Sequence, residues 1–418
     1  MGDVKTQRMP LKLKTQLTGQ SSYSKMGRIS KTWSRHIDAS LEKVITAIHA
    51  SPTQLVFEFA GAGSQALAWL HAVGGSSRTI LEATDRYAGP ALIEAIGFRP
   101  SQFTAPGVAQ ALAIVAFLRA RHLAGPDEAV VGVGCTATIA TDRTKRGNHR
   151  ACWALYDGRT LITDMITLAK GSRTRQAEED VVSRFLIRAI AEVCQVERLP
   201  LAPLLVGEVI HRRSLSLAPI EQLLAGELAW LAIAADDTVA GGQQWPGLVL
   251  LSGSFNPLHQ GHQQMAEVAR RLFGREVYFE LPLVNAGKGG ISLEETLRRR
   301  AQFADLAPLL LTTAPLFGQK AKIFPNSIFM VGLDTVERLL QLRFYENDSV
   351  QMFASFDMMR QAGCRFMVAG RLDAETGQFL TMADVAVPAK LQDLFDQIPE
   401  AEFRVDVSST ALRQRQDG

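Results

Sequence analysis

Two histidines stand three residues apart where a glycine-containing loop meets the expected start of a helix. The segment reads Gly253-Ser254-Phe255-Asn256-Pro257-Leu258-His259-Gln260-Gly261-His262. The exposed backbone N–H groups of such a loop, with the positive dipole end of a helix, favour a phosphate. Side chains three residues apart on a helix point the same way. Both imidazoles could therefore hydrogen-bond the oxygens of a reacting phosphate, and phosphoryl-type transfer needs mainly such positioning and charge stabilisation.

The same histidine spacing could also ligate a metal. A zinc site needs a third or fourth ligand, and no H-E-x-x-H pattern or cysteine partner is adjacent to this pair. We therefore expect a phosphate site here and assign no residue as a metal ligand.

The elements around the motif predict the sheet that would position it. An apolar run, Leu248–Leu251, precedes the loop, and the helix Gln260–Phe273 follows it with one apolar face. Apolar runs without alternation indicate strands buried on both faces, and their alternation with helices predicts a parallel, doubly wound sheet. Ligands bind such sheets at the carboxyl ends of the strands, where the motif lies. The further expected strands are Val277–Leu281, Leu309–Thr312, Ile328–Val331 and Phe366–Ala369.

Three segments, in this order, resemble the nucleotidyltransferase superfamily with the HxGH signature. The histidine motif is most similar to that of the nicotinate and nicotinamide mononucleotide adenylyltransferases, because Asn256-Pro257 follows the aromatic residue. The segment Val331–Asp334 is similar to the family's G-x-D, and Val407–Arg413 is similar to its I-S-S-T-x-I-R. The resemblance implies a Rossmann-like domain that uses ATP with Mg²⁺ and releases pyrophosphate.

The resemblance also implies roles for single residues. His259 and His262 would contact the α- and β-phosphates and the transition state, and Asp334 would face the sugar or the acceptor. Lys288 lies where the family has a phosphate-contacting lysine, and Arg299 or Arg300 could serve nearby. Judged alone, Lys288 would be a solvated loop residue, Asp334 a helix cap, and the Ser-Ser-Thr run an N-cap. The remaining residues implied to hold the nucleotide are Gly253, Ser254, Phe255, Asn256, Gly261, Ser408, Ser409, Thr410 and Arg413.

The segment from about Glu58 to Trp153 resembles the CinA-type C-terminal domain, the nicotinamide mononucleotide amidase family. The matching stretches are Gly61–Ser64, Gly75–Ser77, Glu82–Tyr87 and Val131–Thr136. A CinA-like α/β domain that binds a nucleotide or phosphate is therefore expected in the N-terminal half. Its candidate ligand contacts are Gly61, Gly63, Ser76, Ser77, Tyr87 and Thr136.

This segment departs from the family where the amidase chemistry would be. Phe59 or Ala60 stands where the family places its nucleophilic serine, and Gly89–Leu92 replaces the expected lysine. Without a nucleophile and a base, amide hydrolysis is not expected. Ser64 is better explained as a helix N-cap than as a shifted nucleophile. The run Lys145–Arg150 is better explained as a solvated loop than as an anion site.

The length of 418 residues predicts two or three domains. The Gly- and Pro-containing stretch Gly241–Gly247 indicates a boundary. The expected helices of the first half are Ile37–Ile48, Gln65–Val73, Val108–Leu123 and Ala177–Val196, with a strand at Val130–Val133. We expect a disordered basic tail over 1–35, a CinA-like domain over 36–210, a linker with a helix (Ile220–Ala235) over 211–246, and the nucleotidyltransferase domain over 247–418.

The composition of the whole chain indicates which kinds of partner and which cellular location to expect. The net charge of +3 is small, so no nucleic-acid partner is expected, although the tail Met1–Arg35 is basic. That tail has a composition typical of disorder and, less well, of an organelle transit peptide. Four scattered cysteines without a C-x-x-C pair fit free thiols in a reducing cytosol. No apolar run reaches the length of a bilayer span, so a soluble, cytoplasmic protein is expected, with a homo-oligomer left open.

Three functions remain from the sequence. The first is an adenylyltransferase that acts on nicotinamide or nicotinate mononucleotide with ATP and Mg²⁺. The second is a transferase that uses ATP or CTP with another phosphorylated acceptor. The third is a non-catalytic, nucleotide-binding regulatory protein, which the intact His259, His262 and Arg413 disfavour.

Overall fold

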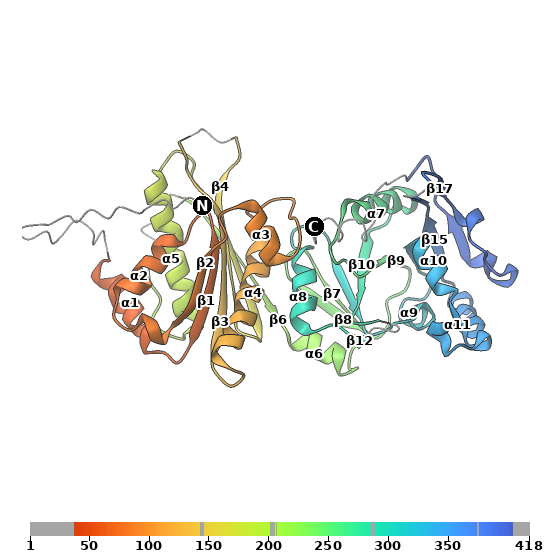
Figure 1. Ribbon diagram of the computed structural model, residues 1–418, viewed down its shortest axis with the longest axis horizontal. Helices are drawn as coiled ribbons and strands as arrows, with labels where there is room; N and C mark the ends of the chain where they lie inside the picture. The colour runs from red at the N-terminus through yellow and green to blue at the C-terminus, as the bar shows by residue number, and fades with distance from the viewer. Residues whose placement is uncertain are drawn as a thin grey trace, which may run out of the picture.

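A computed structural model describes residues 37–142, 146–200, 205, 207–285, 289–373 and 376–403. Two α/β units lie side by side, and each is built on its own large sheet (Figure 1). The predicted fold class, α/β in both halves of the chain, is confirmed. The tail 1–35 lies outside the described residues.

The N-terminal sheet has six strands in the order β2-β1-β3-β4-β5-β6. The first three are parallel, and the last three continue the sheet antiparallel. The sequence indicated only the strand at the start of β3. The bounds are β1 Gln54–Ala60, β2 Ile80–Asp85, β3 Val130–Thr138, β4 His149–Tyr156, β5 Thr160–Leu168 and β6 Ile210–Ser216.

Helices cover both faces of this sheet. One face packs against the first, second and fifth helices in a shared apolar cluster, and the other face meets the third and fourth, which lie toward the C-terminal unit (Figure 1). The bounds are α1 Ala39–Ala50, α2 Ser64–Ala72, α3 Gly89–Ile96, α4 Pro106–Ala124 and α5 Arg175–Val193, with a short 3-10 helix η1 at Ser76–Arg78.

Helix α4 is the central helix of the molecule. Two glycines of β3 let it approach the sheet closely: a Cβ on Gly132 would lie 2.0 Å from the Ala113 carbonyl oxygen, and one on Gly134 would lie 2.3 Å from that of Ala109. By length and composition α4 could cross a membrane, which the sequence analysis did not expect, but 61% of its apolar window is buried inside the protein. Its apolar sequence is explained by this burial between the sheet and the C-terminal unit.

The C-terminal sheet has eight strands in the order β18-β15-β14-β9-β10-β13-β7-β8. Six are parallel, and counted along the chain their order is 6-5-4-1-2-3, the doubly wound arrangement that the sequence predicted. The parallel strands are β9 Val249–Ser252, β10 Val277–Pro282, β13 Leu309–Thr312, β14 Ile328–Gly332, β15 Arg365–Ala369 and β18 Phe395–Gln397. The antiparallel strands β7 Trp230–Ile233 and β8 Val239–Gly242 extend the edge beside β13.

The helices of this unit also divide between the two faces of its sheet. Two of them share an apolar cluster with one face, and three pack on the other. The first group is α7 Gln260–Phe273 and α8 Leu293–Ala301, and the second is α9 Phe317–Ile323, α10 Leu333–Leu339 and α11 Ser349–Gln361. Smaller elements are the strands β11 Val284–Asn285, β12 Gly289–Gly290, β16 Arg371–Leu372 and β17 Phe379–Leu380, and the 3-10 helices η3 Leu342–Tyr345, η4 Met382–Asp384 and η5 Ala389–Leu394.

The connecting segment 211–246 takes part in both sheets. The helix expected over Ile220–Ala235 is wrong in extent, because α6 spans only Ala218–Leu224. Gly226, at φ +79°, follows the end of this helix in a conformation that favours glycine. The chain then enters β7 of the C-terminal sheet, whereas β6, just before α6, belongs to the N-terminal sheet.

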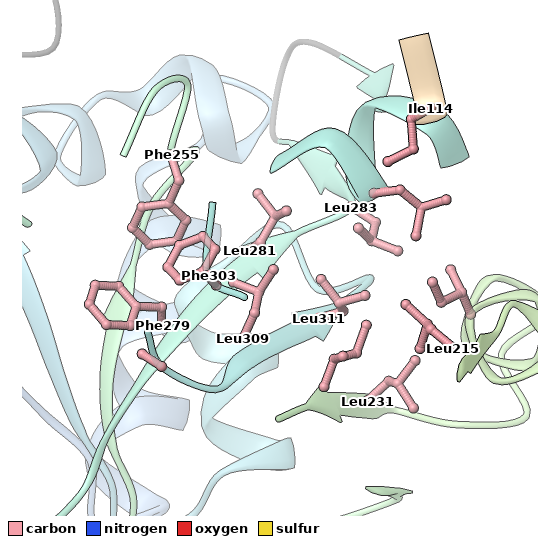
Figure 2. Close-up of a cluster of buried hydrophobic side chains, with 14 of the residues drawn as sticks. Ile114, Leu215, Leu231, Phe255, Phe279, Leu281, Leu283, Phe303, Leu309 and Leu311 are labelled. Carbon is pink, nitrogen blue, oxygen red and sulfur yellow. The ribbon is translucent and has the colours of Figure 1, made fainter. Parts of the chain in front are cut away.

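One apolar cluster runs through both units. It joins Ile114 of α4 and Leu215 of β6 to Leu231 of β7 and to Leu281 and Leu311 in the C-terminal sheet (Figure 2). Because this cluster is continuous, the two units are packed on each other rather than joined only by a tether.

All four cysteines are buried and free, and burial raises the pKa of the Cys152 thiol to about 12.

Candidate active site

The histidine motif follows β9 directly and leads into α7. Strand β9 lies between β10 and β14, which is the point where the order of the parallel strands reverses. In a doubly wound sheet the crevice for a ligand opens at this point, beyond the carboxyl ends of the strands. The sheet therefore places Gly253, Ser254, Phe255, Asn256 and Gly261 together with both histidines at the expected ligand position.

The two imidazoles stack on each other at the start of α7. Their ring centroids are 3.7 Å apart with 29° between the planes. His259 is the N-cap residue with an extended backbone, and its N–H donates to Nδ1 of His262 over 3.3 Å. Because Nδ1 of His262 accepts this bond, the proton of the neutral ring lies on Nε2. Nε2 of His262 is thus a hydrogen-bond donor suited to a phosphate oxygen.

Burial keeps this pair uncharged. Desolvation, and to a smaller extent the neighbouring His259, lowers the pKa of His262 to about 3, and desolvation also lowers the pKa of His259. Phe255, which is buried, contributes to this environment because its ring meets that of His262 edge to face at 5.1 Å. At neutral pH the site therefore offers neutral imidazoles, which donate hydrogen bonds without a net charge.

The lowered pKa of His262 predicts a pH dependence of stability. The unfolded state binds a proton at His262 below about pH 6.5, whereas the folded state resists it down to about pH 3, so stability present above pH 6.5 is lost as the pH falls through this window. His262→Asn removes that titration. Between about pH 6.5 and pH 4.5, the free energy of urea unfolding should fall by about 2 kcal/mol less in the variant than in the wild type. Equal losses in both proteins would contradict a desolvated His262 with a lowered pKa.

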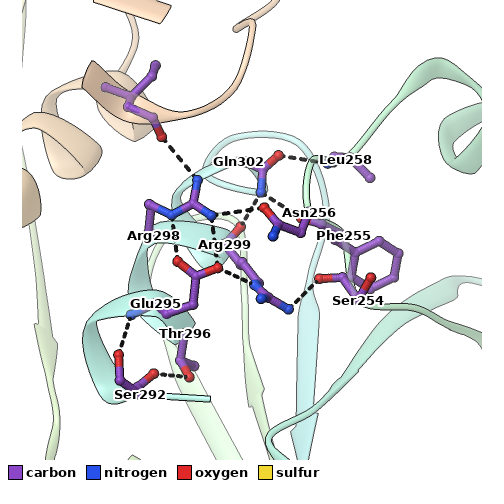
Figure 3. Close-up of polar contacts among 11 residues, drawn as sticks. Ser254, Phe255, Asn256, Leu258, Ser292, Glu295, Thr296, Arg298, Arg299 and Gln302 are labelled. Atoms are coloured by element: carbon purple, nitrogen blue, oxygen red, sulfur yellow. Dashed lines mark hydrogen bonds and ion pairs between the residues drawn. The ribbon is translucent and has the colours of Figure 1, made fainter. Parts of the chain in front are cut away.

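Helix α8 holds the motif loop in place (Figure 3). Arg299 Nη1 donates to the Ser254 carbonyl oxygen at 2.9 Å, and Arg298 Nη2 donates to Asn256 Oδ1 at 2.9 Å. Gln302, the C-cap of the helix, donates from Nε2 to the Phe255 carbonyl oxygen at 3.0 Å. Its Oε1 accepts from the Leu258 N–H at 2.7 Å. The shape of the loop between β9 and α7 therefore depends on the position of α8.

Most of this support for the loop could not be predicted from the sequence. Arg298, Gln302 and Glu295, whose carboxylate binds Arg298 and Arg299, were not singled out. The signal was the run Arg298–Arg300 between two expected strands, but the direction of each side chain depends on tertiary packing. Arg299 binds the loop, and Arg300 is buried against Gln110 of α4, at 2.7 Å, and Asp237. These contacts favour structural roles for Arg299 and Arg300 over the phosphate contact considered from the sequence.

The remaining residues implied for the nucleotide lie in two places. Asp334, in the first turn of α10, follows β14, which pairs with β9, so it shares the carboxyl edge with the motif. Its side chain is 60% exposed and forms an ion pair with Arg371 Nε at 2.7 Å. The residues Lys288, Ser408, Ser409, Thr410 and Arg413 lie outside the described part of the chain.

The candidate contacts of the N-terminal unit are divided between two edges of its sheet. Gly61, Gly63 and Thr136 lie at the carboxyl ends of β1 and β3, and Tyr87, 70% exposed, follows β2 at the same edge. Ser76 and Ser77 lie in η1, which precedes β2, and so belong to the opposite edge. The structure therefore does not bring the six residues together. Thr136 is buried, and its hydroxyl donates to the Phe103 carbonyl oxygen at 2.7 Å.

A carboxylate of the protein already fills the anion position at the start of α2. Glu179 Oε1 accepts from the Gly63 N–H at 2.9 Å, the Gln65 N–H at 3.0 Å and the Ser64 hydroxyl at 3.1 Å. Donors of this kind at a helix start would otherwise suit a phosphate. A phosphate at Gly63 would therefore have to displace Glu179.

The basic run Lys145–Arg150 is only partly a solvated loop. Its last two residues begin β4, where His149 is buried with Nδ1 2.8 Å from Glu178 Oε1, and Arg150 pairs with Gln102. Lys145 lies outside the described residues. Among the residues that the structure describes, no group of three or more His, Cys, Asp and Glu side chains could hold a metal ion.

Comparison with protein families matches residues 250–415 to the family described as Cytidylyltransferase-like. The comparison with curated proteins found no match. Solved structures that match include the competence/damage inducible protein CihA from Agrobacterium tumefaciens, at 13% identity and TM-score 0.32 over 37% of this chain and 96% of that one. A competence-damaged protein (CinA) superfamily member from Enterobacter cloacae matches at 16% identity and TM-score 0.30 over 40% of this chain and 98% of its own.

The family match spans the histidine motif, the Gly332–Asp334 segment and the Ser-Ser-Thr run, the three segments on which the nucleotidyltransferase resemblance rested. The region 250–415, which contains the HxGH motif, is therefore similar to the cytidylyltransferase-like family, and this similarity supports a nucleotidyltransferase.

Proposed function

We propose that the C-terminal domain transfers AMP from ATP to nicotinamide or nicotinate mononucleotide and releases pyrophosphate. One observation carries the proposal: two stacked, half-buried imidazoles, each with a pKa lowered by desolvation, stand at a helix start beyond the carboxyl end of β9. The resemblance of Gly253–His262 to the motif of the mononucleotide adenylyltransferases supports the choice of acceptor. The family match supports nucleotidyl transfer as such.

In the proposed reaction, an oxygen of the acceptor's phosphate attacks the α-phosphorus of ATP in line. A bond forms between this oxygen and the α-phosphorus, and the bond from the α-phosphorus to the α–β bridging oxygen breaks, so pyrophosphate leaves with that oxygen. Negative charge builds up on the phosphoryl oxygens during the transfer. His262 Nε2, with its proton fixed by the bond at Nδ1, would donate to one of these oxygens, and His259 would bind beside it.

Magnesium would accompany the nucleotide. Mg²⁺ keeps several waters and is usually held by substrate phosphates with one or two carboxylates rather than by a dedicated protein cage. Asp334, which lies at the same edge of the sheet as the histidine motif, fits this mode. The ion would neutralise charge on the phosphates when bound.

The N-terminal domain, in this proposal, does not hydrolyse amides. Phe59 and Ala60, at the position of the family's nucleophile, are buried in β1. Ser64 begins α2 and donates its hydroxyl hydrogen to Glu179, whose Oε1 also accepts two backbone N–H groups. Because the same oxygen binds backbone N–H groups of the first turn, we assign this contact a structural role at the start of α2.

The test is pyrophosphate release by the purified full chain with Mg²⁺ and ATP or CTP. The acceptors are nicotinamide mononucleotide, nicotinate mononucleotide and a panel of other phosphorylated alcohols and sugars, with a reaction lacking acceptor as control. The proposal predicts release with ATP and one or both mononucleotides. Release only with another acceptor, or only with CTP, would replace the proposed substrates with those of another transferase, an alternative that the cytidylyltransferase-like description favours. Nucleotide binding without release under any condition would indicate a regulatory protein.

A further inference from the structure

Helix α8 contacts the motif loop on one side and the N-terminal domain on the other. We propose that the N-terminal domain is a structural part of the nucleotide site, that it positions the motif loop through α8, and that Arg298 is the positioning residue that joins the two. As far as turnover is concerned, this inference rests on the proposed nucleotidyl transfer.

Arg298 binds both sides with one guanidinium group. Its Nη2 donates to Asn256 Oδ1 in the motif at 2.9 Å, and its Nη1 donates to the carbonyl oxygen of Ile96, the last residue of α3, at 3.2 Å. Glu295 fixes the same group through Nε at 2.6 Å and Nη2 at 2.8 Å. The side chain is 19% exposed. Because the guanidinium is planar and its donors have a fixed geometry, holding it at Ile96 and Glu295 determines where the Asn256 amide lies.

The N-terminal helices fit α8 without spare room. A Cβ on Gly107, in the first turn of α4, would lie 2.1 Å from the carbonyl oxygen of Ala301, the last residue of α8. A Cβ on Gly97, the C-cap of α3, would lie 2.6 Å from Arg298 Nη1. Both distances are well below ordinary contact distances, so a side chain added at either glycine would have to move α8 or Arg298.

A buried polar contact strengthens the same junction. Arg300 Nη1, two residues after Arg298 in α8, donates to Gln110 Oε1 of α4 at 2.7 Å, and Gln110 Nε2 donates to Asp237 Oδ2 at 3.0 Å. All three side chains are buried. Packing and hydrogen bonds therefore fix the side of α8 that contacts α4. Because α8 is one helix, this also fixes the position of the side that contacts the motif loop.

The first experiment measures the geometry of the motif without any substrate. Nuclear magnetic resonance of the full chain, with labelled histidine, reports the ring signals of His259 and His262, which are identified by their single substitutions. Gly107→Ala adds the methyl group that meets the Ala301 carbonyl, and Arg298→Ala removes the bridge. Gly74→Ala is the matched control, because its Cβ would meet no atom within 4 Å.

We expect both histidine signals to shift in Gly107→Ala and in Arg298→Ala and to stay in place in Gly74→Ala. Alanine favours a helix over glycine by about 1 kcal/mol, so a shift in Gly107→Ala reports the contact with α8 and not a weaker α4. Unchanged signals in Arg298→Ala would overturn the proposal. Should Gly107→Ala fail to fold, Gly97→Ala takes its place, because its Cβ would meet Arg298 Nη1 at 2.6 Å from the N-terminal side.

The second experiment measures turnover. Arg298→Ala should lower kcat by about 10- to 100-fold with a smaller change in KM, because a misplaced motif affects the reacting geometry most. Arg298→Lys should recover part of this loss, since a lysine can keep one of the two contacts. Unchanged kcat in Arg298→Ala would overturn the inference. If the wild type releases no pyrophosphate, the proposed function fails, and the histidine signals still decide whether the N-terminal domain positions the loop.

Discussion

Replacing His259 by alanine should lower turnover by about 100- to 1000-fold and leave the fold intact. Removing a single preorganised donor from a site where negative charge develops typically costs this much. His259 stacks on His262, so the substitution removes one imidazole and the stacking contact of the other, while the backbone N–H of residue 259 can still donate to His262 Nδ1. The effect should fall on kcat more than on KM, because the charge on the phosphoryl oxygens grows in the transition state.

Steady-state pyrophosphate release and circular dichroism of the same preparation measure this effect. His122→Ala is a suitable control, since His122 is exposed near the end of α4, away from the motif. It should keep wild-type turnover. If His259→Ala kept more than about a tenth of wild-type kcat, the imidazole would not act as a donor in the transition state.

Replacing Asp237 by asparagine should lower the free energy of unfolding by about 3 kcal/mol, because it leaves the charge of Arg300 buried without its carboxylate. Both side chains are 1% exposed, and Asp237 also accepts from Gln110 of α4. Asparagine is preferred to alanine for the test, since residue 237 has φ +71°, a conformation that asparagine tolerates. The loss therefore reports the charge and not backbone strain.

Urea unfolding followed by tryptophan fluorescence gives this free energy. Asp236→Asn is the matched control: Asp236 is the exposed neighbour, and its substitution should change stability by less than about 1 kcal/mol. Combining Asp237→Asn with Arg300→Met removes the unpaired charge and should recover much of the loss. A loss below about 1 kcal/mol in Asp237→Asn would show that the junction of α4, α8 and the β7–β8 turn is solvated.

The parallel strands of the C-terminal sheet and helix α7 could be predicted from local sequence patterns. Helix α7 spans the predicted Gln260–Phe273, and β13 spans the predicted Leu309–Thr312, because a period of 3.6 and an unbroken apolar run are both local signals. The antiparallel strands β4, β5 and β6 were not predicted from such local patterns. The expected helix over Ile220–Ala235 wrongly included the residues of β7. Trp230–Ile233 is an apolar run too short to separate a strand from a helix by periodicity alone.

The candidate site was predictable only where the residues are contiguous. The motif Gly253–His262 is one contiguous segment of loop and helix start, so the spacing of its residues alone indicated a phosphate site. The support from Arg298 and Gln302 depends on how α8 packs, and the carboxylate of Glu179 reaches Gly63 across more than a hundred residues of sequence. Such long-range contacts are set by the packing of whole elements, which a local pattern does not encode.

Transfer of the label from ATP marked at the α-phosphorus tests the central proposal most directly. The full chain is incubated with Mg²⁺, the labelled ATP and nicotinamide or nicotinate mononucleotide, and the products are separated. We predict that the label appears in a dinucleotide that also contains the acceptor, in amounts equal to the pyrophosphate released, and that His259→Ala makes little of it. Label that remains in ATP, or that appears only in free AMP, would contradict transfer to these acceptors.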